Sequence, residues 1–296
     1  MRMIRQIKVL PRLRPKLWGI GLLMGAQLFL AVSHTFAKLA THSVPLSQIT
    51  TYRYAIPLIG MWGWMVISHR SVAPIRNFMG SFSWLLVVRG VLGTGSLFCL
   101  LAAFKVGAIS RVAFLNATSC MWALCLSAVF LKERLRPLVV VAMLTGLWGI
   151  YLICHPESGG IGMADGFAIA SAITTAFIAI SLKSLRRVYS SRDIVMGFYL
   201  VGLVLSLPFA IRHGVRGLDE AGWYMVGVAG FGVLGQWCLS ESFRYLQAAI
   251  VSGLSMCGVL FFLISGMLVF NESFSGMEWM GSAILLGSLI VIAFRS

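Results

Sequence analysis

The sequence has 296 residues, of which 59% are hydrophobic and 11% are charged, and its formal net charge is +15. An average soluble domain is roughly 45–50% apolar and about 25% charged, so this composition excludes an ordinary soluble fold. The basic residues occur in short clusters between apolar runs rather than on one amphipathic face, and this distribution argues against a nucleic-acid partner.

Apolar runs of about twenty residues recur along the chain, and each is long enough to cross a hydrocarbon core of roughly 30 Å. The expected membrane spans, in chain order, are 17–38, 49–69, 83–104, 107–131, 138–154, 163–185, 193–212, 222–243, 248–270 and 277–294. The joins at 104–107 and 243–248 are tight. The first run also fits a signal peptide, but it exceeds the roughly 7–15 apolar residues of such a peptide. We therefore predict an all-α polytopic membrane protein with ten transmembrane helices.

The basic residues orient these spans. If the N-terminus is cytoplasmic, inner segments hold 17 of the 24 basic residues and outer joins hold 5, as the positive-inside rule requires. Six of the inner basic residues lie in the tail 1–16. We therefore expect an inner-membrane protein with both termini in the cytoplasm.

An internal repeat divides the chain. Residues 104–133 align without a gap with residues 243–272, at an offset of 139, and a weaker match at offset 145 pairs Tyr54 with Tyr199. The first match pairs Phe104 with Phe243, Val112 with Val251, Leu124 with Leu263 and Glu133 with Glu272. The offset spans five helices, an odd number, so the second half enters the membrane inverted. Inverted repeats are typical of secondary transporters, with the substrate site at the interface between the halves. The expected organisation is a basic tail over 1–16 and five-helix repeats over 17–154 and 163–294.

Short motifs identify a family resemblance. Phe130-Leu-Lys-Glu-Arg-Leu135 leads into Thr145-Gly146-Leu-Trp-Gly149, and Val269-Phe-Asn-Glu-Ser-Phe274 is its counterpart in the second half. On these motifs, and on Arg89-Gly90-Val-Leu-Gly93, the chain resembles the EamA-type members of the drug/metabolite transporter superfamily. The resemblance covers nearly the whole chain after the tail, and it implies alternating access for solutes such as amino acids, nucleosides or S-adenosylmethionine. A proline often found midway along the fourth and ninth helices of that family is absent here, so backbone breaks are not implied there.

Charged groups within the spans indicate the site, because burying a charge in a membrane costs several kcal/mol unless the charge is paired or hydrated. Arg53 and Arg89 are both substrate-binding candidates. Snorkelling accounts for Arg53, near the outer end of its span, better than for Arg89, so Arg89 is the principal candidate, either as a cavity residue or as a member of an internal ion pair. His34 is a further candidate, either as a ligand or as a titrating group, and a simple structural hydrogen bond is the alternative for this histidine. The excess of cations over carboxylates predicts a substrate with an anionic group, such as an amino-acid carboxylate.

Further substrate-binding candidates are polar and aromatic residues at mid-depth. They are Asn116, Ser119, Trp122, Thr175, Gln236, Trp237 and Ser255. The two amides need a partner in hydrocarbon, whereas each hydroxyl could simply bond to its own helix backbone or lie in a close helix contact. The tryptophans could wall a cavity or pack in the core.

Three carboxylates bear on coupling or gating. Glu241 lies within a span at helical spacing from Arg244, so a structural ion pair is the alternative to proton coupling. Glu133 and Glu272 lie at helix ends, where hinge or capping contacts suffice. Proton-linked transport and facilitated or exchange transport both stay open.

These patterns predict a secondary transporter that exports a small organic, carboxylate-bearing metabolite by alternating access. An uptake carrier for a nucleoside- or S-adenosylmethionine-like metabolite is the alternative within this class. The chain lacks HExxH, GxSxG and Walker motifs, which disfavours a membrane-embedded enzyme, and a lipid-precursor flippase is the remaining alternative. The expected partners are the solute and the bilayer, without nucleic acid, cofactor or metal, and a homodimer stays open.

Overall fold

A computed structural model describes residues 10–40, 44–69, 78–80, 82–106, 109–133, 136–154, 162–212, 222–271 and 273–295, and it contains no strand in these ranges. The helices are α2 (Leu10–Ala40), α3 (Leu46–His69), α5 (Trp84–Val106), α6 (Ile109–Ala117), α7 (Ser119–Leu126), the π-helical turn η1 (Ser127–Leu131), α8 (Pro137–Cys154), α9 (Met163–Leu185), α10 (Ser191–Arg212), α11 (Gly222–Tyr245), α12 (Ala248–Leu254), α13 (Cys257–Phe270) and α14 (Gly276–Arg295). The prediction of an all-α fold is confirmed for this part of the chain.

Seven helical segments in the described ranges have the length and hydropathy of a membrane span. They are Pro15–Ala40, Arg111–Leu131, Pro137–Cys154, Met163–Leu185, Ser191–Arg212, Ala248–Phe270 and Gly276–Arg295. Helix α5 adds a shorter apolar stretch, Trp84–Leu100. Helices α3 and α11 do not reach the same hydropathy, because tryptophan, tyrosine, glycine and polar residues such as Arg53 and Gln236 interrupt their aliphatic runs. The protein is therefore a polytopic all-α membrane protein.

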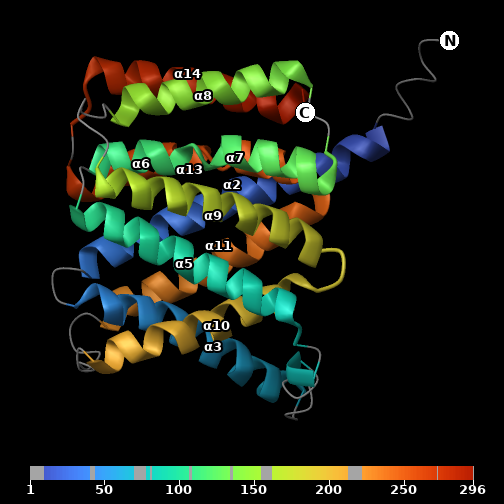
Figure 1. Cartoon of the computed structure of the whole chain (residues 1–296), viewed down its shortest axis with the longest axis vertical. Coiled ribbons are helices and arrows are strands. Elements are labelled where there is room, and N and C mark those ends of the chain that lie inside the picture. The colour runs from blue at the N-terminus through green and yellow to red at the C-terminus, as the bar shows by residue number, and fades with distance from the viewer. Residues whose placement is uncertain are drawn as a thin grey trace.

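The helices of the two halves pair with one another. Helix α2 packs against α11, and α5 packs against α9, while α3 packs against α10 and α8 against α14. Figure 1 shows α8 with α14 at one end of the assembly and α3 with α10 at the other. When α2, α3, α5 and α8 are exchanged, in that order, with α9, α10, α11 and α14, the α2–α11 contact becomes the α9–α5 contact and the other two pairs stay the same. The tertiary contacts thus have the pattern of a two-fold relation between the halves.

Two of the long apolar segments are broken near their middle. Helix α6 ends at Ala117 and α7 begins at Ser119, while α12 ends at Leu254 and α13 begins at Cys257. At the first break the Thr118 hydroxyl donates to the Leu115 carbonyl at 2.6 Å. In both turns several backbone N–H groups bond to the carbonyl three residues earlier, as in a 3₁₀ turn. A Thr or Ser hydroxyl that competes for a helix carbonyl can bend a helix, so these breaks need no proline.

Each broken segment also ends in the same unusual backbone conformation. Lys132 has φ 53° and Asn271 has φ 51°, and in the described part of the chain they are the non-glycine residues with positive φ. Each is the C-terminal cap of its helix. The two residues are separated by 139 positions, which is the offset of the sequence repeat. The repeated sequence therefore has the same local fold in both halves.

Helices α8 and α14 meet at two glycines. A Cβ added to Gly149 would lie 2.7 Å from the carbonyl oxygen of Gly281, and one added to Gly281 would lie 2.6 Å from that of Gly149. Small residues let helix backbones approach closely in lipid, where hydrophobic association offers no driving force. This pair of glycines therefore sets the closest approach of the last helices of the two halves.

Candidate functional site

Arg89 of α5 is a buried cation. The residue is 3% exposed, and its Nη2 donates to the side-chain oxygen of Gln236 on α11 at 3.4 Å. Its Nε and Nη1 are buried without a hydrogen-bond partner in the described ranges. Buried polar groups in proteins nearly always have partners. The guanidinium therefore keeps donors that are free for a further ligand.

Glycine one turn after Arg89 makes room for its side chain. A Cβ at Gly93 would lie 2.5 Å from Nη1 of Arg89 and 2.6 Å from the ring of Phe198. Any larger residue at this position would displace the guanidinium or the ring. The glycine four residues after Arg89 in the sequence motif thus leaves the space that the guanidinium occupies.

Aromatic side chains of α3 and α10 wall the guanidinium. The Arg89 guanidinium carbon lies 4.6 Å from the centroid of the Phe198 ring, in a cation–π contact. The Phe198 ring meets Tyr54 edge to face, with centroids 5.5 Å apart. Tyr54 and Tyr199 are each 1% exposed, and the Tyr199 hydroxyl is buried with no hydrogen-bond partner among the described residues. The site therefore combines a fixed positive charge, an amide, a phenol and flat apolar rings.

No carboxylate of the described residues balances the charge of Arg89. The salt bridges found among the described residues involve Arg111, Arg186, Arg192 and Arg244, and none involves Arg89. A guanidinium stays protonated in proteins, so this positive charge is permanent. Removing a charge from water costs several kcal/mol, which an opposite charge with good geometry offsets. The arrangement is suited to bind an anionic group.

Arg53 extends the positive region toward His34. The charge of Arg53 acts on His34, Tyr54 and Tyr199, so these groups share one electrostatic neighbourhood with the Arg89 site. The His34 ring packs against Phe262 of α13, with centroids 5.5 Å apart. The structure thus joins two predicted residues, Arg89 and Gln236, by a hydrogen bond. Arg53 lies within electrostatic range of His34 and of the tyrosines of this site.

Asn116 and Thr175 belong to a separate polar cluster between α5, α6 and α9. Asn116 Nδ2 donates to the Ser171 hydroxyl at 3.0 Å, and Thr175 Oγ1 lies 2.9 Å from the Ser96 hydroxyl. The Ser171 hydroxyl in turn donates to the Ser96 carbonyl at 3.0 Å. Each polar group already has a protein partner, as at a close helix contact in a membrane. These hydrogen bonds connect helices, and they give Asn116 and Thr175 a structural role.

The remaining mid-depth candidates lie at the breaks or on exposed faces. The Ser255 hydroxyl donates to its own helix at the Val251 carbonyl, at 2.8 Å, and Ser119 begins α7 directly after the first break. Trp122 is 40% exposed and Trp237 is 44% exposed. No ring contact or hydrogen bond joins either tryptophan to Arg89 in the described structure.

The carboxylates of Glu241 and Glu133 make structural contacts. Glu241 accepts hydrogen bonds from Arg186 at 3.0 Å and from the Ser191 hydroxyl at 2.6 Å, and it lies 3.6 Å from Arg244. This network connects α9, α10 and α11, and it agrees with the ion-pair alternative for Glu241. The carboxylate of Glu133 accepts from the backbone N–H of Ala248 at 3.0 Å, at the start of α12. Glu272 lies outside the described residues.

Sequence reasoning missed the aromatic wall. Phe198 was not selected, because aromatic residues are frequent in apolar helices and nothing in their spacing marks a site. The sequence did mark Tyr54 and Tyr199, because the repeat at offset 145 pairs these two tyrosines. An interface between inverted repeats is where a transporter site is expected, so matched residues that lie on that interface deserve selection.

Comparison with known proteins agrees with this architecture. Over 93% of this chain and 96% of its own length, one crystal structure superposes with a TM-score of 0.76 at 18% identity, which shows a shared fold. An uncharacterized transporter of Helicobacter pylori is 22% identical over 94% of this chain and 95% of its own. The pseudopaline exporter of Pseudomonas aeruginosa is 23% identical, covering 93% and 95%, and a riboflavin transporter of Vibrio cholerae is 23% identical, covering 93% of each chain.

The profile of the EamA-like transporter family matches residues 17–154 and 162–294, which together make up most of the chain. The helical fold, the span-like helices and this match agree with the resemblance seen in the sequence motifs. The chain belongs to the EamA-like transporter family of the drug/metabolite transporter superfamily, and it is a membrane transporter.

Proposed function

We propose that this protein is a secondary transporter that exports a small organic metabolite across the inner membrane and binds the carboxylate of that metabolite at Arg89. The observation that carries the proposal is a buried guanidinium with two unused donor nitrogens and no carboxylate partner among the described residues. Gln236 orients the guanidinium from α11, and Phe198 covers one of its faces. An anionic solute group would both use the free donors and offset the desolvation of the cation.

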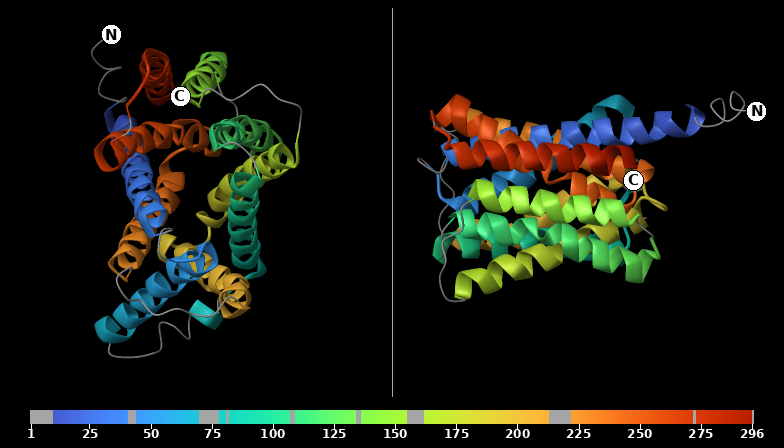
Figure 2. Two further views of the ribbon diagram at one scale, coloured as in Figure 1. Left: turned by 90° about the vertical axis from the view of Figure 1, so that its left-hand side faces the viewer. Right: turned by 90° about the horizontal axis from the view of Figure 1, so that it is seen from above.

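The proposed architecture has ten spans in two inverted five-helix repeats, over 17–154 and 163–294, with both termini in the cytoplasm. The start of α2 and the end of α14 lie on the same side of the assembly in Figure 2, which supports an even number of crossings. The excess of basic residues in the inner segments supports the orientation. Alternating access then changes the packing of one half on the other around the Arg89 site.

Export is the proposed direction, and one similar protein is named as an exporter. An uptake carrier for a nucleoside-like metabolite is the second candidate, and the aromatic wall favours it. Phe198 and Tyr54 offer flat faces and edges on which a heterocyclic ring would stack. Another similar protein is named as a riboflavin transporter.

Untargeted mass spectrometry of cells and medium tests the proposal. Deletion, wild-type and overexpressing strains are compared with a strain that overexpresses the Arg89→Gln variant at the same membrane level. Export predicts that a class of carboxylated metabolites moves from cells to medium with the wild-type protein and not with the variant. Depletion of the medium would establish uptake instead, and transport of uncharged solutes that is insensitive to Arg89→Gln would overturn the assignment of the site.

A further inference from the structure

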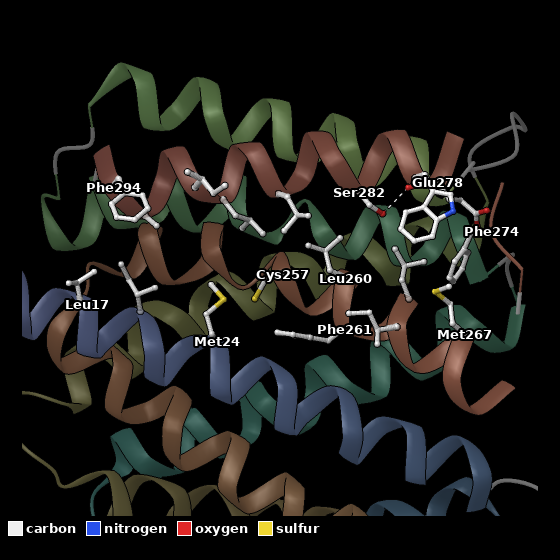
Figure 3. A pocket seen from close by; sticks show the side chains of 18 residues that line it. Leu17, Met24, Cys257, Leu260, Phe261, Met267, Phe274, Glu278, Ser282 and Phe294 are labelled. Atoms are coloured by element: carbon white, nitrogen blue, oxygen red, sulfur yellow. Dashed lines mark hydrogen bonds between the residues drawn. The ribbon is translucent and has the colours of Figure 1, made fainter. Parts of the chain in front are cut away.

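A cavity lies away from the Arg89 site, between α2, α13 and α14. It has a volume of about 480 Å³, within the range of roughly 300–1,000 Å³ of small-molecule sites. Its lining is apolar apart from Glu278 and Ser282, and it shares no residue with the Arg89 site. Figure 3 shows Leu17 and Phe294 near one end of this groove and Phe274 and Glu278 near the other.

The groove is long and narrow rather than round. Its lining on α14 runs from Glu278 to Phe294, which corresponds to about 24 Å at a rise of about 1.5 Å per residue. The groove is thus longer than the depth of a single leaflet, which is about 15 Å, half of a hydrocarbon core of roughly 30 Å. A groove that follows the helix axes over such a distance has the shape of an extended acyl chain.

Basic residues gather at the Leu17–Phe294 end of the groove. Lys16 precedes Leu17 on α2, and Arg295 follows Phe294 on α14. Arg136, at the start of α8, donates from Nη1 to the carbonyl oxygen of Arg295 at 3.2 Å, and its charge also acts on Lys16. No salt bridge joins Arg136 or Arg295 to a carboxylate in the part of the chain described. Three cations therefore meet at one mouth of an apolar groove.

We propose that this groove binds an anionic phospholipid, with an acyl chain along α14 and the phosphate at Lys16, Arg136 and Arg295. The charge at the mouth selects the occupant, because clustered basic residues beside membrane helices attract anionic headgroups. A second copy of the chain is a poorer occupant. Each copy carries a net charge of +15, and a symmetric dimer through this groove would bring like charges together. The lipid fills the space between α13 and α14, and the proposal does not depend on the transported solute.

Native mass spectrometry of the detergent-purified protein tests this site. Dioleoylphosphatidylglycerol and dioleoylphosphatidylcholine are added separately at equal concentrations. We expect at least fivefold more bound phosphatidylglycerol on the wild-type protein. The Arg136→Gln/Arg295→Gln double variant should lose this preference. The Arg187→Gln/Arg192→Gln double variant makes the same change of net charge at exposed positions elsewhere and should keep it.

A variant within the groove distinguishes a lipid bound in the groove from anionic lipid attracted only by the basic residues. Ala293 lines the groove near its basic end, so Ala293→Trp fills the space that the acyl chain needs. We expect this variant to bind at least fivefold less phosphatidylglycerol while it keeps its elution volume and melting temperature. Equal binding of the two lipids, equal losses in the two double variants, or unchanged binding by Ala293→Trp would each overturn the proposal. A dimer that forms without added lipid and dissociates in Ala293→Trp would assign the groove to a second copy instead.

Discussion

The rings of Tyr54 and Tyr199 meet edge to face, with centroids 6.1 Å apart, although 145 residues separate them in the sequence. That separation is also the offset at which the two halves of the sequence match. Residues that are equivalent in two related halves and touch each other lie close to the axis that relates the halves. The Phe198 ring contacts both Tyr54 and the Arg89 guanidinium, so the buried cation lies beside this axis.

Replacing Arg89 should abolish most transport of anionic solutes. A hydrogen bond to a charged group contributes about 1.5–3 kcal/mol, so Arg89→Gln should lower the flux roughly ten- to a hundredfold. Arg89→Lys should also lower it at least tenfold, because an ammonium cannot reproduce the planar, five-donor fork. Counterflow in proteoliposomes gives the rates, with Arg192→Gln as the matched control for loss of a positive charge. Full anion flux in Arg89→Gln would rule out the assigned role.

Removal of the Tyr199 hydroxyl should affect solute binding and protein stability differently. Tyr199→Phe removes a buried group that has no hydrogen-bond partner in the described structure, so stability should stay the same or rise by about 1 kcal/mol. If this hydroxyl contacts the solute, the same variant should lower transport severalfold. Melting in detergent and counterflow are measured on one preparation. Normal transport together with raised stability would leave the hydroxyl without a role in binding.

Glu241 should act on stability and not on proton coupling. Glu241→Gln leaves Arg186, whose side chain is 7% exposed, without its anionic partner. Removal of one member of a buried ion pair costs about 3–5 kcal/mol of stability. Because this pair is only partly buried, Glu241→Gln should lower the free energy of unfolding by somewhat less, and expression and melting temperature should fall. Arg192→Gln, which breaks a more exposed ion pair with Asp193, should cost less than about 1 kcal/mol. A loss of pH-dependent flux at unchanged stability would instead make Glu241 the coupling group.

Glu133 joins the end of one half to the start of a helix in the other. Its carboxylate caps the first turn of α12 through Ala248 and Ala249. Glu133→Ala should lower the free energy of unfolding by about 0.5–2 kcal/mol, as loss of a helix cap does, while Glu133→Gln keeps an acceptor oxygen and should cost less. Thermal unfolding in detergent gives the ranking. Equal stability of the alanine variant and the wild type would contradict this capping role.

The glycine contact between α8 and α14 is tested by one methyl group. Gly281→Ala places a Cβ 2.6 Å from the Gly149 carbonyl, so it should destabilise the protein by about 1–3 kcal/mol, as overpacking does. The matched control is Gly287→Ala on the same helix, where a Cβ meets no atom within 4 Å. This control should be neutral or stabilise by up to about 1 kcal/mol, because alanine favours a helix. Similar melting temperatures of the two variants would show that the helices separate without cost.

The sequence alone determined the class of the protein and its principal buried charge. Apolar runs of membrane length have few alternatives to helices, because the bilayer core offers no water to satisfy the backbone. Arg89 could be selected from its depth in a span, since the cost of a buried charge depends on that depth. The repeat could be read because equivalent helices keep similar residues, and the matching αL caps at Lys132 and Asn271 show the same local structure at both positions.

Only the tertiary structure decided which side chains surround that charge. Helical periodicity shows which face of a helix is apolar, but it does not show which helix lies opposite, so Phe198 could not be placed over Arg89. The same limit explains Asn116 and Thr175, whose polar groups are satisfied across helices that are distant in sequence. The breaks at Thr118 and Ser255 also escaped prediction, because a hydroxyl bends a helix only where the surrounding packing accepts the bend. Contacts between helices depend on three-dimensional packing, and a one-dimensional pattern does not contain it.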